Sequence, residues 1–192
     1  MLERRKLGGA GLALLVSALG CGSRAMPSAP VVEQSGRALL MPARFGWLSS
    51  EHATPSLPSA IALGGKASGR TLLYFEFPEL TELRPLLRAE LLLNAMGAPG
   101  STIEVELSRA EEPHQLAVWS DQPRALYPRI SAQISTARSP ERLDVTEILR
   151  AQTKPGQPLR LLLRAEPGDA EPVLIETGAA GGAAPRLEAY FQ

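Results

Sequence analysis

The chain has little of several residue types that carry chemistry. Its 192 residues include one cysteine, Cys21, and two histidines, His52 and His114. A single cysteine excludes an intramolecular disulfide, so the fold has to rest on the burial of apolar side chains. Nucleophilic and zinc enzymes need such residues at defined spacings, and neither Gly-x-Ser-x-Gly nor His-Glu-x-x-His occurs. We therefore expect a protein without catalytic residues, a cofactor or a resident metal.

Two further shortages bear on the partners of the protein. Lysine and arginine together number 20, aspartate and glutamate together also number 20, and the formal net charge is zero. Nucleic-acid binding relies on an excess of positive charge, so the composition argues against a nucleic-acid partner. Aromatic residues make up only 5% of the chain, which leaves few side chains that can stack on a base or a sugar ring.

The N-terminus has no apolar run of the roughly 20 residues that a membrane-spanning helix needs. The apolar segment Leu12–Leu19 is shorter and follows the basic segment Met1–Lys6, as in a signal peptide. Ala18-Leu19-Gly20-Cys21 then resembles a bacterial lipobox, although Ala18 and Leu19 stand in the reverse of the usual order. We expect residues 1–20 to be a signal peptide and Cys21 to carry the lipid that anchors the protein to a membrane.

Two alternatives to this lipoprotein interpretation are a secretory signal cut near Ala25 and a buried apolar helix with an inert cysteine. A lipid anchor favours the cell envelope, and in particular the outer membrane of a Gram-negative bacterium. The Pro, Ser and Ala residues of Gly22–Gly36 indicate a flexible tether over residues 21–36. Residues 37–192 have the length of one globular domain.

Thr71–Phe77, with the sequence TLLYFEF, is the clearest strand of this domain. Aromatic side chains fit a pleated, half-buried surface, so the segment predicts a central strand. Alternation along the strand places Phe75 and Phe77 on one face and Tyr74 and Glu76 on the other. We expect the first pair in the core and the second pair at the surface.

Other short apolar runs are separated by turn residues at the spacing of a β-sandwich. The predicted strands are Arg37–Met41, Ala60–Leu63, Leu86–Leu93, Ser101–Ser108, Ile130–Ile134, Leu143–Val145 and three more that begin near Leu159, Val173 and Arg186. Long loops are expected over Phe45–Pro58 and Glu111–Arg124. One helix is expected over Thr146–Gln152, with Asp144 and Glu147 at the spacing of a capping box. The fold class is therefore an all-β, antiparallel jelly-roll-type β-sandwich with one short helix.

Several segments follow one another in a characteristic order, namely Ala60–Gly64, Leu72–Phe77, Ala89–Leu93, Trp119–Pro123, Asp144–Thr146, Leu159–Leu163 and Pro185–Phe191. In this order they resemble the DNRLRE-type domain, a β-sandwich related to carbohydrate-binding modules and common on secreted bacterial proteins. The resemblance covers nearly all of residues 37–191. Glu76 replaces the usual Asp, and the Ser/Asn-rich stretch before Pro185 is reduced to Gly and Ala. A ligand site shaped by that stretch in relatives would be lost here.

The shared segments are mostly those that a sandwich core needs, so the resemblance supports the fold more than binding. Polysaccharide binding is the function expected from its relation to carbohydrate-binding modules. Sugar rings stack on exposed aromatic side chains, and the candidate ligand-binding residues are Trp47, Tyr74, Trp119 and Tyr127. Trp119 has a second interpretation, because the loop tryptophan of relatives packs against the core. Arg160 and Arg164 alternate with leucines along one strand, which indicates either a basic strip for an acidic polysaccharide or a solvated sheet face.

Calcium is the metal ion that loop carboxylates of a sandwich most often bind, and Asp121 and Asp169 are candidate ligands if they are not plain turn residues. We expect a non-catalytic, lipid-anchored envelope protein that acts in adhesion or polysaccharide binding. One alternative is a structural or assembly subunit that contacts another envelope or secretion protein through a sheet face or edge. Another is an accessory domain of a polysaccharide-degrading system.

Overall fold

The computed structural model describes residues 32–34, 36–51, 56–80, 84–152, 156–179 and 181–192. The predicted signal peptide, Cys21, His52 and most of the predicted tether lie outside these ranges. Within them, no helix has the length and apolar character needed to cross a bilayer.

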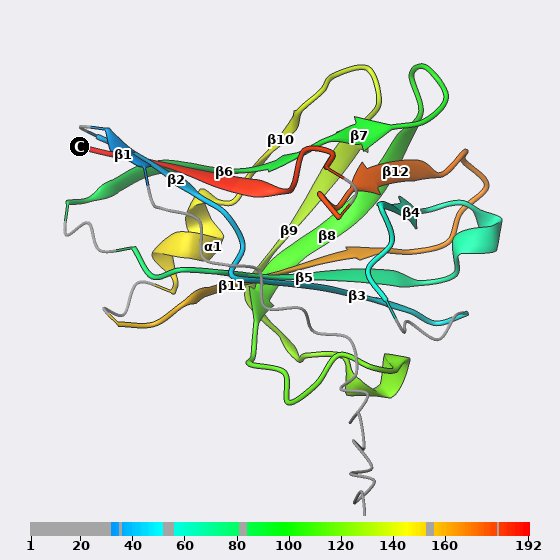
Figure 1. Ribbon diagram of the computed structural model, residues 1–192, viewed down its shortest axis with the longest axis horizontal. Coiled ribbons are helices and arrows are strands. Elements are labelled where there is room, and N and C mark those ends of the chain that lie inside the picture. Colours follow the sequence, from blue (N-terminus) through cyan, green and yellow to red (C-terminus); the bar gives the residue numbers. More distant parts are fainter. Residues whose placement is uncertain (1–31, 35, 52–55, 81–83, 153–155, 180) are drawn as a thin grey trace, which may run out of the picture.

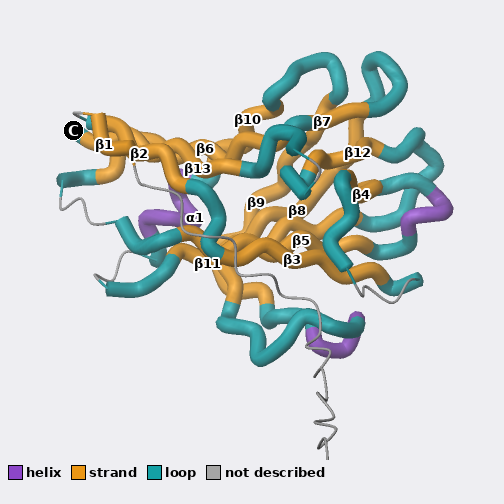
Figure 2. Tube along the Cα trace, viewed as in Figure 1, coloured by secondary structure: helices purple, strands orange, loops and turns teal. Residues whose placement is uncertain are grey.

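The described residues form an antiparallel β-sandwich with two main layers (Figures 1 and 2). The lower sheet of Figure 1 contains, in spatial order, β3 (Arg44–Ser49), β5 (Thr71–Phe77), β11 (Leu159–Ala165), β8 (Thr102–Ala110) and β9 (Ala125–Ser135). The upper sheet contains β1 (Val32–Gln34), β2 (Arg37–Leu40), β13 (Arg186–Phe191), β6 (Leu86–Leu93) and β10 (Glu141–Asp144). The expected all-β sandwich is confirmed.

A third, three-stranded sheet continues the upper layer at one end (Figure 1). It contains β4 (Ala60–Leu63), β12 (Val173–Glu176) and β7 (Ala95–Met96) in that order. At the other end, the short helix α1 (Thr146–Arg150) lies between the layers and buries Ile148 and Leu149. The two layers are therefore closed at one end by a helix and extended at the other by strands.

Strand β5 has the central position that its composition predicts. It pairs with β3 on one side and with β11 on the other. Phe75 stacks on Phe45 with ring centroids 5.0 Å apart and on Phe77 with centroids 6.2 Å apart. All three rings are buried between the layers, where aromatic pairs add to the free energy gained from apolar burial.

Helix α1 begins where expected but is capped differently. Val145, not Asp144, is the residue at the helix N-cap, and Glu147 pairs with Arg150 at 2.7 Å. Asp144 accepts hydrogen bonds from the backbone N–H (2.9 Å) and the hydroxyl (2.6 Å) of Thr146. Burial raises the pKa of Asp144, but these hydrogen bonds outweigh it and leave the pKa below its ordinary value.

Two expectations about irregular segments are wrong. Arg44–Ser49, the start of the expected loop over Phe45–Pro58, is strand β3, and Val32–Gln34 of the expected tether is strand β1. Strand β3 is buried on both faces, so its sequence lacks the alternation that marks a half-exposed strand. The described part of the sandwich therefore begins before residue 37.

The segment 111–124, named here the covering loop, packs against the outer face of the lower sheet. It includes the 3₁₀ turn η2 (Trp119–Asp121) and hangs beneath that sheet in Figure 1. A second apolar cluster forms under it from Leu48, Leu72, Tyr74, Ala110, Leu116 and Leu162, with Trp119 and Ala125 packed at its margin. Part of a face that would otherwise meet water is therefore buried.

Candidate functional site

A groove of about 300 Å³ lies where the covering loop rejoins the lower sheet. Its lining consists of Gln122, Pro123, Arg124, Ala125, Leu126, Tyr127, Arg129 and Arg164. These residues come from the end of the covering loop, the first half of β9 and the outer face of β11. The backbone N–H of Glu111 donates to the carbonyl of Arg124 at 3.1 Å and closes the base of the loop.

Tyr127 is the exposed aromatic side chain of this groove, with 78% of its surface accessible. The strand register between β8 and β9 shifts at Ser108 and Arg109, so Arg129 faces Ser108 while Leu126 faces Arg109. Tyr127 lies in the extra residues of β9 that this irregularity leaves unpaired, and such bulges re-aim side chains at the edge of a sheet. The guanidinium of Arg129 lies 5.4 Å from the centre of the Tyr127 ring, which is the geometry of a cation–π contact.

Three arginines line the groove and form only weak ion pairs. Arg124 lies 3.9 Å from Glu111, whereas Arg129 and Arg164 share Glu106 at 3.7 and 3.9 Å. These nitrogen–oxygen distances exceed those of a hydrogen bond, so the guanidinium groups keep donors that the carboxylates do not satisfy. With three cations against two carboxylates, this part of the surface has an excess of positive charge.

Arg164 and Arg109 each hold a buried Nε without a hydrogen-bond partner in the described part of the chain. Arg164 lines the groove and uses a terminal nitrogen to donate to Gln122 Oε1 at 3.1 Å. A buried donor without an acceptor costs about 1–3 kcal/mol. This Nε has almost no accessible surface, so a ligand would contact the terminal nitrogens of Arg164 instead.

The groove therefore combines a flat aromatic ring with planar, charged donors. An aromatic face contacts the apolar side of a sugar ring, and a guanidinium donates two parallel hydrogen bonds to a carboxylate or sulfate. No nucleophile–base pair is formed by the groove residues. The arrangement favours binding of an acidic sugar.

Tyr74 does not take part in this surface, which corrects the expectation that it is exposed. It has no accessible surface, because the covering loop packs over the outer face of β5. Its hydroxyl donates a 2.6 Å hydrogen bond to Glu76, and the Arg44 guanidinium lies 5.8 Å from the centre of its ring. Tyr74 is therefore part of the packing that holds the loop in place.

The two tryptophans are also partly buried. Trp47 lies on strand β3, not in the expected loop, and packs against the main core while its Nε1 donates to the carbonyl of Ser56 at 3.2 Å. Trp119 begins η2 and packs against the cluster beneath the covering loop. Of the four aromatic candidates, Tyr127 alone has a largely exposed ring.

The predicted basic strip on β11 is divided between two environments. Arg160 donates to Glu76 at 3.0 Å and to Glu112 at 2.8 Å, so its charge is neutralised by close carboxylates. Arg164, four residues further along the strand, lines the groove. Only one end of the strip is available to an acidic ligand.

The candidate calcium ligands have other partners. The carboxylate of Asp121 accepts from the backbone N–H of Val118 at 3.3 Å, and Asp169 pairs with Lys66 at 2.9 Å. The described ranges contain no group of three or more His, Cys, Asp or Glu side chains that could hold a metal ion.

Arg124 and Arg129 are groove residues that the sequence interpretation missed. The signal was present in Pro123–Arg129, where two arginines and two prolines flank Tyr127 within seven residues. Arginine and tyrosine are both enriched at binding surfaces, so their concentration in this segment is a local signal of a binding site. The proximity of Arg164 to these residues requires the fold.

Comparisons with known proteins do not assign this chain to a family. The resemblance to the DNRLRE-type domain therefore stays a prediction. The chain matches no protein-family model and, at a significant level, no curated protein.

Proposed function

We propose that the protein is a non-catalytic, lipid-anchored β-sandwich of the bacterial cell envelope that binds acidic polysaccharide. Cys21 carries the anchor, and the groove at Tyr127 contacts the glycan. A polysaccharide with carboxylate or sulfate groups on its sugar units fits this groove better than a neutral one, because guanidinium groups outnumber carboxylates there.

One observation supports this function most directly. Tyr127 is exposed over 78% of its surface and lines a groove together with Arg124, Arg129 and Arg164. An exposed ring gains free energy when a sugar covers it, since apolar surface on both partners leaves water. Arg164 lines the same groove and keeps an accessible part of its guanidinium for an acidic group.

The test is a binding measurement with polygalacturonate or alginate and with neutral dextran. The full chain should bind the acidic polymers, and added salt should weaken this binding because the contacts are ionic. Tyr127→Ala should lower affinity about tenfold, which corresponds to ~1.4 kcal/mol. Arg124→Gln/Arg129→Gln should lower affinity at least as much and remove the preference over dextran.

A matched control removes two exposed positive charges outside the groove. Lys66→Gln/Arg70→Gln changes the net charge equally but involves no groove residue, so it should bind acidic polymers like the unaltered chain. Equal binding of all variants, or no binding of either acidic polymer, would refute the proposed glycan site.

A second candidate function is the assembly subunit, and one feature of the lower sheet favours it. Strand β9 is 11 residues long and is the last strand of its sheet, so one edge has no neighbour in that sheet. Such an edge can accept a strand from another protein through backbone hydrogen bonds. If this alternative holds, a crosslinking group placed at Gln133 on β9 should capture a protein partner in intact cells.

A further inference from the structure

The outer face of the upper sheet contains two buried carboxylates side by side. Glu90 on β6 and Glu188 on β13 are direct register partners, and only 4% and 3% of their surfaces are accessible. Like charges placed directly opposite each other destabilise a sheet unless cations compensate them. The surroundings of this pair therefore have to supply positive charge.

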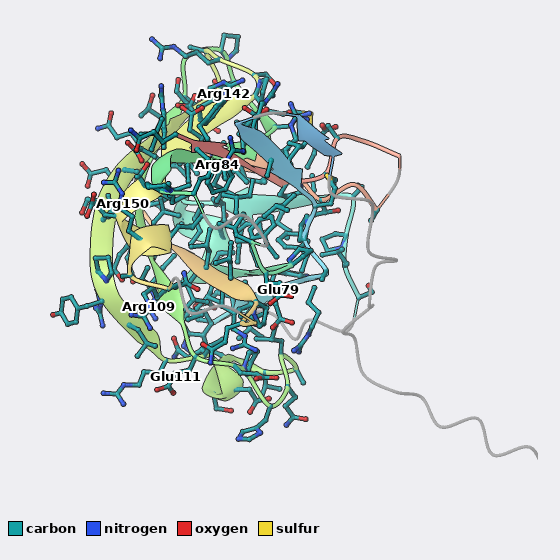
Figure 3. All side chains as sticks on the ribbon, turned by 90° about the vertical axis from the view of Figure 1, so that its left-hand side faces the viewer. Glu79, Arg84, Arg109, Glu111, Arg142 and Arg150 are labelled. Atoms are coloured by element: carbon teal, nitrogen blue, oxygen red, sulfur yellow. The ribbon has the colours of Figure 1, made fainter. Side chains whose placement is uncertain are left out.

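Three arginines supply it from above. Arg142 on β10 bridges the pair, at 2.8 Å from Glu90 and 3.1 Å from Glu188. Arg37 on β2 contacts Glu188 at 2.6 Å, and Arg88 on β6 contacts Glu90. We call Arg37, Arg88 and Arg142, with the two glutamates beneath them, the arginine face. Figure 3 shows Arg142 on the upper side of the sandwich.

The arginine face exposes cations and hides anions. The side chains of Arg37, Arg88 and Arg142 are accessible over 45%, 62% and 46% of their surfaces, whereas both carboxylates lie beneath them. Arg186 lies two residues before Glu188 on β13 and so on the same face, and Asp144 beside Glu90 uses its carboxylate on Thr146. The four arginines exceed the three carboxylates by one positive charge.

The glutamates also fix the positions of the arginines. A guanidinium has five N–H donors, and each contact to a buried carboxylate uses only one or two of them. The remaining donors belong to side chains whose conformational entropy is already lost in the free protein. Such an array suits tetrahedral or planar anions with several oxygens, and phosphate is the commonest of these on a membrane surface.

The chain connection places this face close to the proposed anchor. Strand β1 begins at Val32, 11 residues after Cys21, and 11 residues span at most ~40 Å. Strand β1 pairs with β2, which carries Arg37 at its first position. A lipid on Cys21 would therefore leave the upper sheet within reach of a membrane surface.

The groove lies on the other side of the molecule. It opens on the outer face of the lower sheet, and Figure 3 shows Glu111, at the base of the covering loop, far below Arg142. A sandwich whose upper sheet faces a membrane would thus turn its groove away from that membrane. This orientation leaves the groove accessible to a polymer.

We propose that the arginine face binds the phosphate groups of anionic membrane lipids and orients the sandwich with its groove away from the bilayer. The orientation rests on the proposed anchor at Cys21, whereas the binding of lipid phosphates does not. Each basic residue held at an anionic surface adds about 1 kcal/mol, or roughly fivefold in partitioning. Increased salt should weaken the effect because exposed charges are screened.

The test measures partitioning of the full chain onto two kinds of vesicle, phosphatidylcholine alone and phosphatidylcholine mixed with phosphatidylglycerol. Arg37→Gln/Arg88→Gln keeps Arg142, which contacts both glutamates, so the fold should persist. When phosphatidylglycerol is added to the vesicles, the partition coefficient of the unaltered chain should rise at least tenfold more than that of this variant. The basic N-terminal segment is common to both chains, so its contribution to the comparison cancels.

Two further variants separate charge at this face from charge in general. Arg37→Lys/Arg88→Lys retains the charge and should restore most of the increase in partitioning. Such a recovery would show that the glutamine variant loses charge at this face and not its fold. Arg124→Gln/Arg129→Gln removes two charges from the groove and should partition like the unaltered chain. The proposal is overturned if phosphatidylglycerol increases the partitioning of Arg37→Gln/Arg88→Gln as much as that of the unaltered chain. It is also overturned if Arg37→Gln/Arg88→Gln and Arg124→Gln/Arg129→Gln lose this increase equally. Neither result bears on glycan binding, which is measured without vesicles.

Discussion

Tyr74 and Glu76 lie two residues apart on the outer face of β5, and their side chains meet in a 2.6 Å hydrogen bond beneath the covering loop. Burial and this hydrogen bond raise the pKa of the Tyr74 hydroxyl, so it is a donor at every physiological pH. Burial raises the pKa of Glu76, but the donors Tyr74 and Arg160 outweigh it and lower the pKa overall. The pair is thus a neutral donor bound to a fixed carboxylate.

Removing that donor should destabilise the fold without affecting ligand binding. Tyr74→Phe keeps the ring in its cluster but deprives Glu76 of one hydrogen bond, so we expect a loss of about 1–2 kcal/mol in the free energy of unfolding. Urea unfolding measures it. Glycan binding should be unchanged because Tyr74 is inaccessible, and a specific loss of glycan binding by the folded variant would contradict this assignment.

Gly46 should test how the covering loop is held. A Cβ added at Gly46 would meet the Cδ1 atom of Leu116, in the covering loop, at 2.6 Å. Gly46→Ala should therefore push the loop from β3, at a cost of about 1–3 kcal/mol, and speed proteolysis within residues 111–124. The double variant Gly46→Ala/Leu116→Ala makes room for the new methyl group. Leu116→Ala alone is the reference, because it also lacks the leucine packed under the loop. If adding Gly46→Ala to Leu116→Ala speeds cleavage further, steric pressure on Leu116 is not the cause.

Arg142 should be more important for stability than its exposure suggests, because it bridges two buried carboxylates. Arg142→Ala should destabilise the fold by about 1–2 kcal/mol, which is less than the 3–5 kcal/mol of a fully buried pair because the guanidinium is half exposed. Chemical unfolding checks this. Adding Glu90→Gln to Arg142→Ala should restore part of the loss, and strictly additive losses would show that the bridge contributes nothing.

Acid should weaken the fold through Glu188. Burial raises the pKa of this carboxyl, but hydrogen bonds from Tyr190, Arg37 and Arg142 outweigh it and leave the folded-state pKa below the ordinary value of 4.5. Its stabilising contribution is therefore complete above about pH 4.5 and is lost as pH falls through the lower, folded-state value. Unfolding free energies measured at a series of pH values should fall less on acidification in Glu188→Gln than in the unaltered chain.

The matched control for that experiment is Glu147→Gln, which removes an exposed carboxylate from helix α1. The unfolding free energy of this variant should fall on acidification as much as that of the unaltered chain. An equal fall in Glu188→Gln would assign the pH dependence to other groups.

Cys21 should determine membrane attachment. Diacylation buries far more methylene groups than a single chain, so the unaltered protein should fractionate with membranes even at high salt. Cys21→Ser should move to the soluble fraction, and globomycin should block processing of the unaltered chain. A Cys21→Ser protein that stays in the membrane fraction at high salt would exclude the anchor.

The sequence alone was sufficient where one local pattern determines the outcome. Thr71–Phe77, Ala60–Leu63 and Leu86–Leu93 form strands with the bounds that their apolar runs and flanking turn residues predict. The helix at Thr146 and the irregular segment 111–124 also follow from local signals. Period-2 alternation and turn residues depend on near neighbours in the chain, so no tertiary contact is needed to recognise them.

Only the tertiary structure decided which polar and aromatic side chains reach the surface. Tyr74 and Tyr127 have the same side chain, yet the first is covered by a loop more than thirty-five residues away in sequence and the second extends from the sheet edge. Glu90 and Glu188 are 98 residues apart and become neighbours through strand pairing alone. Burial and charge pairing depend on contacts between distant segments, and a linear pattern does not contain those distances.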